Sequence, residues 1–258
     1  MTKALFFDID GTLVSFTSHR IPESTVEALR QAKARGVKVY ISTGRPVLFI
    51  NNIGQVADLI DGYITTTGAL CIVGNEQFGL HSIEPADARS VLEACHRLGK
   101  SCVVVGTHHI AIINDSEELT RQFREGLALD FEFAPLDVTL SEPLLQLSPF
   151  FTNEEEQAVA TTLSACNSSR WHPSFTDITH READKGKALL AMCRHEGFTK
   201  DETMAFGDGG NDIAILRQAG IGVAMGNASD QVKAAADYVT SSVDDDGISH
   251  ALHHFHVI

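Results

Sequence analysis

Short apolar runs alternate with amphipathic stretches toward both ends of the chain. The runs that read as buried strands span residues 4–9, 37–42, 62–65, 203–207 and 222–225. Helical patterns lie between them, the clearest over residues 22–34, 186–195 and 213–218. Pro46 also suits the first turn of a further helix. Strands that alternate with helices are typical of a parallel, doubly wound sheet, so we predict an α/β protein with a Rossmann-like core.

The alternation stops in the middle of the chain. A hairpin around Gly74-Asn75 is followed by short strands grouped with helices, one of which we expect over residues 117–129. Such a grouping favours an α+β unit with a largely antiparallel sheet. We therefore predict a core formed by residues 1–81 and 183–258, interrupted by an inserted domain formed by residues 82–182.

The composition narrows the classes of partner. The chain has 258 residues and 43% hydrophobic content, with a net charge of −14 and a pI ≈ 5.2. This charge argues against nucleic acid or an anionic membrane as partner, whereas a small anionic substrate can still bind a locally positive site. No signal peptide or bilayer-spanning run is apparent, and the five cysteines contain no C-x-x-C pair. We expect a cytoplasmic monomer or small homo-oligomer with reduced thiols.

The first apolar run ends in two carboxylates, Asp8 and Asp10. Residues i and i+2 of a strand point to the same side, so these two side chains are expected to lie together. Two like charges ~4 Å apart repel by roughly 4 kcal/mol at an effective dielectric constant near 20. The pair therefore needs a metal ion, a lysine or a shared proton to neutralise it.

Two other predicted strands end in polar residues of the same kind. Thr43-Gly44-Arg45 follows the second strand, and Asp208, Asn211 and Asp212 follow the strand at 203–207. Ligands of open parallel sheets bind beyond the carboxyl ends of the strands. We therefore expect the three groups to meet at one site.

Each group also has an ordinary reading when it is taken alone. Asp8-Ile9-Asp10-Gly11 could open a calcium loop, but that loop needs an acidic or asparagine residue at its fifth position and glutamate at its twelfth, where this chain has Thr12 and His19. The glycines at 207–210 lack the G-x-G-x-x-G order of a dinucleotide site. Asn211-Asp212 could be no more than a helix cap.

Taken together, the motifs resemble those of haloacid dehalogenase-superfamily phosphatases. The matching segments occur in order and are Asp8-Ile9-Asp10-Gly11-Thr12, Ser42-Thr43-Gly44-Arg45, Asp184-Lys185-Gly186, and Gly207-Asp208-Gly209-Gly210-Asn211-Asp212. The segments 223–228 and 245–248 are similar to the Cof-type branch, which includes hexose-phosphate phosphatases and carries an inserted cap of the C2B type. One departure is Thr67, which stands where Cof-type chains usually have asparagine.

The resemblance implies a Mg²⁺-dependent phosphomonoester hydrolase that acts on small phosphorylated metabolites. Among these, sugar (hexose) phosphates are the expected substrate class. Asp8 would attack phosphorus and form an aspartyl-phosphate, while Asp10 would act as general acid and base. Mg²⁺ would bind the Asp8 carboxylate, the Asp10 main-chain carbonyl and Asp208, with Asp212 as a supporting carboxylate or a further ligand.

The remaining motif residues would bind the phosphate ester. Thr43, Gly44 and Asn211 would hold phosphoryl oxygens, and Lys185 would neutralise both Asp8 and the phosphate. Arg45 is a further candidate for substrate contact. The inserted cap would choose the leaving group.

Three other functions stay open at this point. A phosphorylated receiver domain combines similar residues but is about half this length. A phosphotransferase or phosphomutase of the same superfamily would pass the phosphoryl group to another acceptor. A non-catalytic sugar-phosphate sensor would keep the site and bind without turnover.

Overall fold

The computed structural model describes residues 1–119 and 132–258, with only the backbone of Trp171, and these form two compact units. The first unit consists of residues 1–80 and 183–258, and the second of residues 81–182. The second unit is thus a continuous segment inserted into the first. Its start lies one residue before the expected insertion of residues 82–182.

The first unit is built on an eight-stranded sheet in the order β13-β12-β11-β1-β2-β3-β4-β5. Its strands are β1 (Ala4–Phe7), β2 (Lys38–Ser42), β3 (Gly62–Thr65), β4 (Leu70–Val73), β5 (Glu76–Phe78), β11 (Thr203–Gly207), β12 (Ile221–Ala224) and β13 (Tyr238–Val239). The pairs from β13 to β3 are parallel, and β4 and β5 extend the sheet as an antiparallel hairpin. This is the doubly wound arrangement that the alternating pattern predicts.

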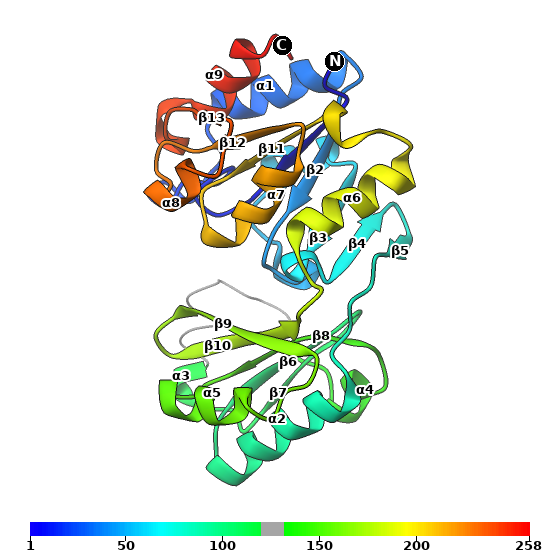
Figure 1. Ribbon diagram of the computed structural model, residues 1–258, viewed down its shortest axis with the longest axis vertical. Coiled ribbons are helices and arrows are strands. Elements are labelled where there is room, and N and C mark those ends of the chain that lie inside the picture. The colour runs from blue at the N-terminus through cyan, green and yellow to red at the C-terminus, as the bar shows by residue number, and fades with distance from the viewer. Residues whose placement is uncertain (120–131) are drawn as a thin grey trace. The chain divides into compact units, whose positions relative to one another are not determined.

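Helices cover both faces of this sheet (Figure 1). They are α1 (Glu23–Ala34), α6 (Lys185–Glu196), α7 (Ile213–Gln218), α8 (Asp230–Lys233) and α9 (Gly247–His254). α1 and α9 pack on one face, while α6 and α7 pack on the other. Because both faces are covered, the central strand β1 is buried along its whole length, which explains its unbroken apolar sequence.

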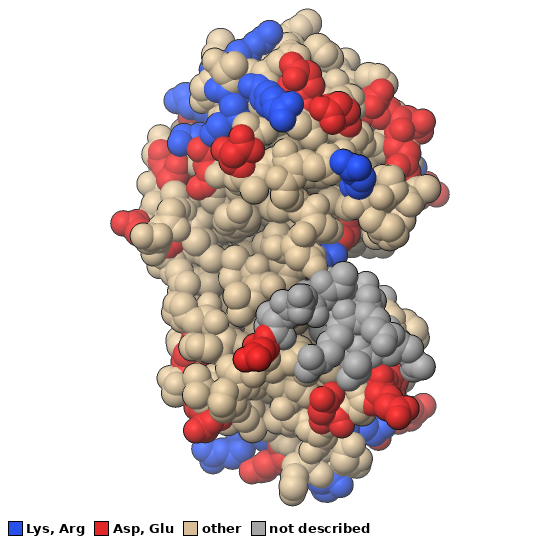
Figure 2. All heavy atoms as spheres, turned by 180° about the vertical axis from the view of Figure 1, so that it is seen from behind, with Lys and Arg blue, Asp and Glu red and all other residues tan. Residues whose placement is uncertain are grey.

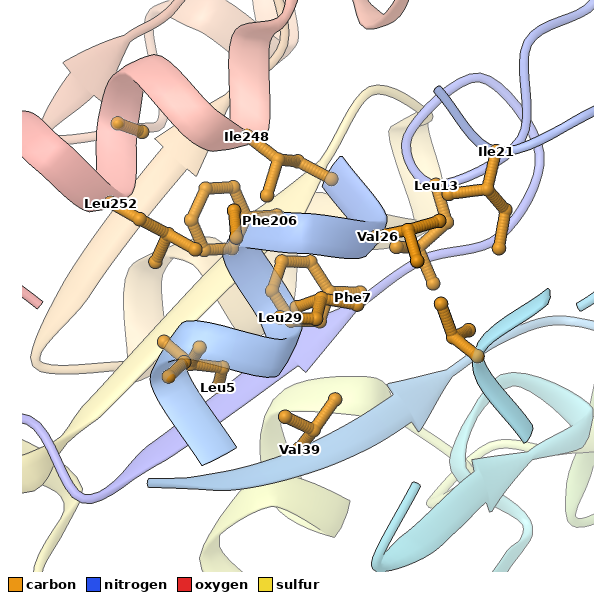
Figure 3. Packing of buried hydrophobic residues seen from close by; sticks show 14 of the residues in the cluster. Leu5, Phe7, Leu13, Ile21, Val26, Leu29, Val39, Phe206, Ile248 and Leu252 are labelled. Carbon is orange, nitrogen blue, oxygen red and sulfur yellow. The ribbon is translucent and has the colours of Figure 1, made fainter. Parts of the chain in front are cut away.

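Alternate residues of β1 pack into two separate hydrophobic cores, one on each face of the sheet. Leu5 and Phe7 point toward α1 and α9, whereas Phe6 packs with Tyr40 on the side of α6 and α7. Figure 3 shows the first of these cores, where side chains of the sheet meet those of the two helices: Leu5, Phe7, Val39 and Phe206 with Val26, Leu29, Ile248 and Leu252. Packing on both sides fixes the position at which β1 ends.

The second unit has a five-stranded antiparallel sheet in the order β7-β6-β8-β10-β9. Its strands are β6 (Cys102–Gly106), β7 (Ile110–Ile113), β8 (Leu144–Pro149), β9 (Cys166–His172) and β10 (Phe175–His180). Its helices are α2 (Pro85–Leu98), α3 (Glu117–Leu119), α4 (Leu136–Leu140) and α5 (Asn153–Ala160). Its hydrophobic core joins α2 and α5 to one face of the sheet.

Some local expectations differ from the structure. The helix expected from Pro46 is replaced by two short 3₁₀ turns, Val47–Phe49 and Gly54–Leu59, because Asn51, Asn52 and Gly54 are poor helix formers. Of the residues expected to form a helix at 117–129, Glu117–Leu119 are helical, and residues 120–129 lie outside the described residues. α4 was not predicted, since its five residues are too few to show a period.

The described surface of the first unit carries both signs of charge. Figure 2 shows Lys and Arg side chains interspersed with Asp and Glu over this unit, although the chain is acidic as a whole. All five cysteines are free and buried. Among residues 1–119 and 132–258, none of the helices has the length and apolar character that crossing a membrane requires.

Candidate active site

Three neighbouring parallel strands deliver polar residues to the same edge of the first sheet. β1 lies between β2 and β11, and its last residue, Phe7, pairs with Ile41 and Phe206. The residues that follow these strands are therefore neighbours in space, and they include Asp8, Thr43 and Asp208. The structure places all three predicted groups at this edge.

Lys185 lies at the centre of the site. It is the first residue of α6, and its side chain has no solvent exposure. Its Nζ is 2.8 Å from Asp8 Oδ1 and 2.6 Å from Asp212 Oδ1. Burial alone would lower the pKa of Lys185, but the carboxylates of Asp212 and Asp8 outweigh burial and raise that pKa above its ordinary value. The lysine is therefore a permanent buried cation.

Asp8 remains incompletely neutralised in spite of this lysine. Burial, together with the neighbouring Asp212 carboxylate, raises the pKa of Asp8 to about 8, and the Lys185 ammonium offsets only part of that rise. Burial also raises the pKa of Asp208 to about 6, partly opposed by a hydrogen bond from the Thr12 hydroxyl. The site thus has an excess of negative charge.

Asp8, Asp208 and Asp212 each present a carboxylate oxygen within 4.8 Å of the others. Both oxygens of Asp212 are already used, since Oδ1 accepts from Lys185 and Oδ2 accepts from the main-chain amides of Asp208 and Gly209. Asp8 Oδ2, in contrast, accepts no hydrogen bond within the described part of the chain. The less engaged oxygen donors for a cation are therefore those of Asp8 and Asp208, since Asp208 accepts from the Thr12 hydroxyl and, over 3.4 Å, from Asn227 Nδ2. Asp212 is then in a supporting position.

A hard divalent cation fits these donors on two grounds. All of the available ligand atoms are oxygens, which Mg²⁺ and similar ions prefer. When all are ionised, the carboxylates of Asp8, Asp10, Asp208 and Asp212 carry four negative charges, and Lys185 and Arg45 supply two positive charges beside them. A divalent cation would neutralise the two negative charges that remain.

Asp10 is held by Arg45 rather than by the lysine. Arg45 Nε donates to Asp10 Oδ2 and Arg45 Nη2 donates to Asp10 Oδ1, each over 2.8 Å. Arg45 Nη1 donates in turn to the main-chain oxygen of Phe49 at 3.0 Å. Such a bidentate pair fixes both side chains. The two predicted site residues thus meet each other in the structure.

Asn211 lies beside the loop that contains Thr43 and Gly44. Arg45 N donates to Thr43 Oγ1 at 3.1 Å, which leaves the hydroxyl hydrogen of Thr43 available. Asn211 Nδ2 lies 3.5 Å from the point that a Cβ on Gly44 would occupy. Because Gly44 has no side chain, a ligand can approach its main chain closely.

Two residues of the site were not assigned by sequence reasoning. Thr12 Oγ1 donates to Asp208 Oδ1 at 2.8 Å. Asn227 Nδ2 donates to the carbonyl oxygen of Gly11 at 2.8 Å, and Asn227 Oδ1 accepts from Val243 N at 3.0 Å. Asn227 therefore ties the loop after β1 to the loop before α9. Its place in a segment similar to the Cof-type branch was the only available signal.

Gly11 explains why the loop after β1 requires glycine. Its φ is 85°, a left-handed conformation that residues with a side chain rarely adopt. A Cβ at this position would also collide with Asp208 Oδ2. The missing side chain lets the loop of Asp8 and Asp10 lie directly against Asp208.

Comparison with known proteins gives consistent relatives over the full chain. The family profile of haloacid dehalogenase-like hydrolases matches residues 5–252. The structure is similar to that of BT4131, a sugar phosphatase of haloacid dehalogenase subclass IIB, with 46% identity, 100% coverage of both chains and a TM-score of 0.90.

Two further relatives are more distant. BT1666, a phosphatase of the same superfamily from Bacteroides thetaiotaomicron, is 33% identical over 100% of this chain and 96% of its own, with a TM-score of 0.86. The 5-amino-6-(5-phospho-D-ribitylamino)uracil phosphatase YcsE of Bacillus subtilis is 29% identical over 98% of this chain and 95% of its own.

Proposed function

Because this chain belongs to the haloacid dehalogenase-like hydrolases and is an enzyme of their phosphatase class, we propose that it is a Mg²⁺-dependent phosphomonoesterase of small sugar phosphates, hexose phosphates above all. The observation that carries the proposal is the buried contact between Lys185 and Asp8 beside Asp208. It supplies a carboxylate with one unshared oxygen and a fixed cation, next to oxygen donors for a second cation. The likeness to a sugar phosphatase at 46% identity supports the substrate class.

Mg²⁺ would be held by Asp8, Asp208 and the main-chain carbonyl of Asp10. When bound, the ion neutralises carboxylate and phosphoryl charge, so that two anions can approach each other. Asp212 would support the site by fixing Lys185 and the main chain of the loop after β11.

In the proposed first step, one carboxylate oxygen of Asp8 forms a bond to phosphorus while the bond from phosphorus to the alcohol oxygen breaks, and the other oxygen would bind Mg²⁺. Lys185 keeps Asp8 Oδ1 in place and stabilises the negative charge of the phosphoryl oxygens. Thr43, the amide of Gly44 and Asn211 orient those oxygens. The product of this step is an aspartyl-phosphate on Asp8.

Asp10 carries the proton in both steps of the proposal. It gives a proton to the departing alcohol oxygen, and it then takes a proton from the water that attacks the aspartyl-phosphate. Arg45 occupies both oxygens of Asp10 in the structure. A phosphate dianion gives Arg45 an alternative partner, and this exchange would free Asp10 for proton transfer.

The inserted unit, residues 81–182, would select the leaving group, since the residues of the proposed site recognise only phosphate. Within this unit, Arg170 is engaged by Glu156 at 2.7 Å and by the carbonyl of Phe151. The proposal also includes a cytoplasmic location, with which five free cysteines are compatible.

A phosphate-release screen over hexose, pentose, nucleotide and cofactor phosphates tests this function. We expect release from hexose phosphates with Mg²⁺ and loss of release when a chelator removes the metal, with recovery on adding Mg²⁺ back. Full activity in chelator would contradict the metal role. Release only when a second alcohol is present, with a phosphorylated product, would indicate a phosphotransferase, and binding without release would indicate a sensor.

A further inference from the structure

The turn after β3 contains two threonines in an unusual backbone conformation. Thr66 has a φ of 51° and Thr67 a φ of 56° with a ψ of 26°, and Gly68 follows with a φ of 97°. β-Branched residues are strongly disfavoured in this left-handed region, where glycine and asparagine are the usual occupants. Two such residues in sequence cost stability, and strain of this kind persists where the surrounding structure enforces it.

Hydrogen bonds to the loop after β2 enforce the conformation. Thr67 N donates to the carbonyl oxygen of Thr43, and Thr66 N donates to that of Arg45, both at 3.1 Å. On its other side the turn touches the start of α6, because a Cβ on Gly68 would lie 2.5 Å from the carbonyl oxygen of Asp184. The turn therefore joins the proposed phosphate-binding loop to the residue that precedes Lys185.

The two threonine side chains have different surroundings. Thr66 is fully buried, and its hydroxyl has no hydrogen-bond partner within the described residues. Thr67 is half-buried, and its Oγ1 lies 3.5 Å from the point that a Cβ on Gly44 would occupy, the same distance as Asn211 Nδ2. The Thr67 hydroxyl and the Asn211 amide thus converge on the open side of Gly44.

We propose that Thr67 binds the substrate directly, by donating a hydrogen bond from its hydroxyl to the phosphoryl oxygen that lies over Gly44. This inference rests on the proposed function. It gives the strained turn a purpose, because the left-handed conformation is what directs the Thr67 side chain to Gly44. A phosphoryl oxygen would also provide the acceptor that this hydroxyl lacks within the described part of the chain.

Three substitutions separate the hydroxyl from the backbone conformation. Thr67→Val keeps the β-branched shape and removes the hydroxyl, whereas Thr67→Ser keeps the hydroxyl and removes the branch. Thr66→Val makes the same chemical change one residue earlier, at a hydroxyl that faces the protein interior. The measurements are KM for the best ester of the screen and the inhibition constant of inorganic phosphate, both with Mg²⁺ present.

We expect Thr67→Val to raise KM and the inhibition constant of phosphate together, each by roughly tenfold, as for a hydrogen bond to a charged group. Thr67→Ser and Thr66→Val should leave both constants within about twofold of wild type. If Thr67→Val folds poorly, Thr67→Ala takes its place in the test. Thr67→Ala also lacks the hydroxyl, so it should raise both constants by a similar factor.

An unchanged phosphate inhibition constant in Thr67→Val would overturn the inference, even if KM rises, because the contact would then lie outside the phosphoryl group. Equal effects of Thr67→Val and Thr66→Val would also overturn it and assign the turn a purely structural role. If wild-type protein releases no phosphate from any ester, calorimetric binding of inorganic phosphate to wild type and Thr67→Val still decides it. In that case, weaker binding of phosphate by Thr67→Val would support the contact with Thr67, and only the proposed phosphatase function would be contradicted.

Discussion

Asp8 in the first unit and Asp87 in the second are both buried aspartates, yet their surroundings shift their acidity in opposite directions. Asp87 Oδ1 accepts from the amide and hydroxyl of Ser164, and its Oδ2 accepts from the amides of Ala165 and Cys166. Burial would raise the pKa of Asp87, but these hydrogen bonds outweigh burial and lower that pKa to about 2. Asp8 shares one lysine with Asp212, and its pKa is raised to about 8.

The difference separates two uses of a buried carboxylate. Main-chain donors around Asp87 are fixed by the fold and saturate both of its oxygens, so the residue acts as an anchor between α2 and the start of β9. One oxygen of Asp8 accepts no hydrogen bond within the described residues, and its negative charge is only partly neutralised. A carboxylate in such surroundings is a candidate for a reacting group. Burial alone does not distinguish the two residues. The number and kind of their hydrogen-bond and ion-pair partners do.

Asp8→Asn should have the largest effect of any single change. Removal of the proposed nucleophile is expected to lower kcat by roughly 10⁴-fold or more, as for nucleophiles in other covalent mechanisms. The melting temperature should stay the same or rise, because the substitution removes one of several crowded negative charges. Phosphate-release assays and thermal unfolding check the two expectations. Near-normal turnover in this variant would show that Asp8 is not the nucleophile.

Lys185→Met should affect both stability and activity. The substitution leaves Asp8 and Asp212 buried without their shared cation, which typically destabilises by about 3–5 kcal/mol. Denaturant unfolding measures this loss, and phosphate release should disappear with it. Lys187→Met is the matched control, since Lys187 is exposed two residues away. Equal stability of the two variants would contradict the central place given to Lys185.

Asp87→Asn should destabilise the protein and leave its chemistry intact. The amide of asparagine cannot accept four hydrogen bonds, so main-chain donors lose partners, at a cost of about 2–3 kcal/mol. Urea unfolding measures the loss, with exposed Asp137→Asn as a control that should change stability by no more than about 0.5 kcal/mol. kcat at temperatures well below unfolding should match wild type. A large fall in kcat in Asp87→Asn would contradict the view that Asp87 is structural and Asp8 is the reacting aspartate.

The same anchor predicts a smaller effect of pH. The pKa of Asp87 is lowered on folding, so its contribution is fully present above the unfolded value near 3.8 and is lost as pH falls toward 2. The size of that contribution is about 2 kcal/mol. The stability difference between wild type and Asp87→Asn should therefore shrink between pH 5 and pH 2. A difference that stays constant over this range would mean that Asp87 is not held as an anion.

Much of the first sheet was predictable because its elements carry strong local signals. The strand at 203–207 and the helix at 213–218 have the bounds expected from their apolar patterns. α2 also begins at Pro85 and ends before Gly99, as its terminal residues indicate. The short helix α4 and the turns after Pro46 lack such signals.

The site was predictable in its members more than in its contacts. The motif order identifies Asp8, Lys185 and Asp208, and the structure brings them together. The pairing of Arg45 with Asp10 could not be predicted, because it depends on distances between residues that are 35 positions apart. The left-handed Thr66 and Thr67 run against local preference, so no propensity argument would have placed them.

The position of β1 between β2 and β11 also bears on how the chain folds as it is synthesised. Ala4 pairs with Lys38 on one side and with Thr203 on the other, so the central strand acquires its second neighbour only after most of the chain has emerged. All strands of the second sheet come from one continuous segment between Cys102 and His180. Vectorial synthesis therefore completes the strands of the inserted unit before β11 can pair with β1. Until then the apolar edge of β1 is unpaired and exposed to aggregation.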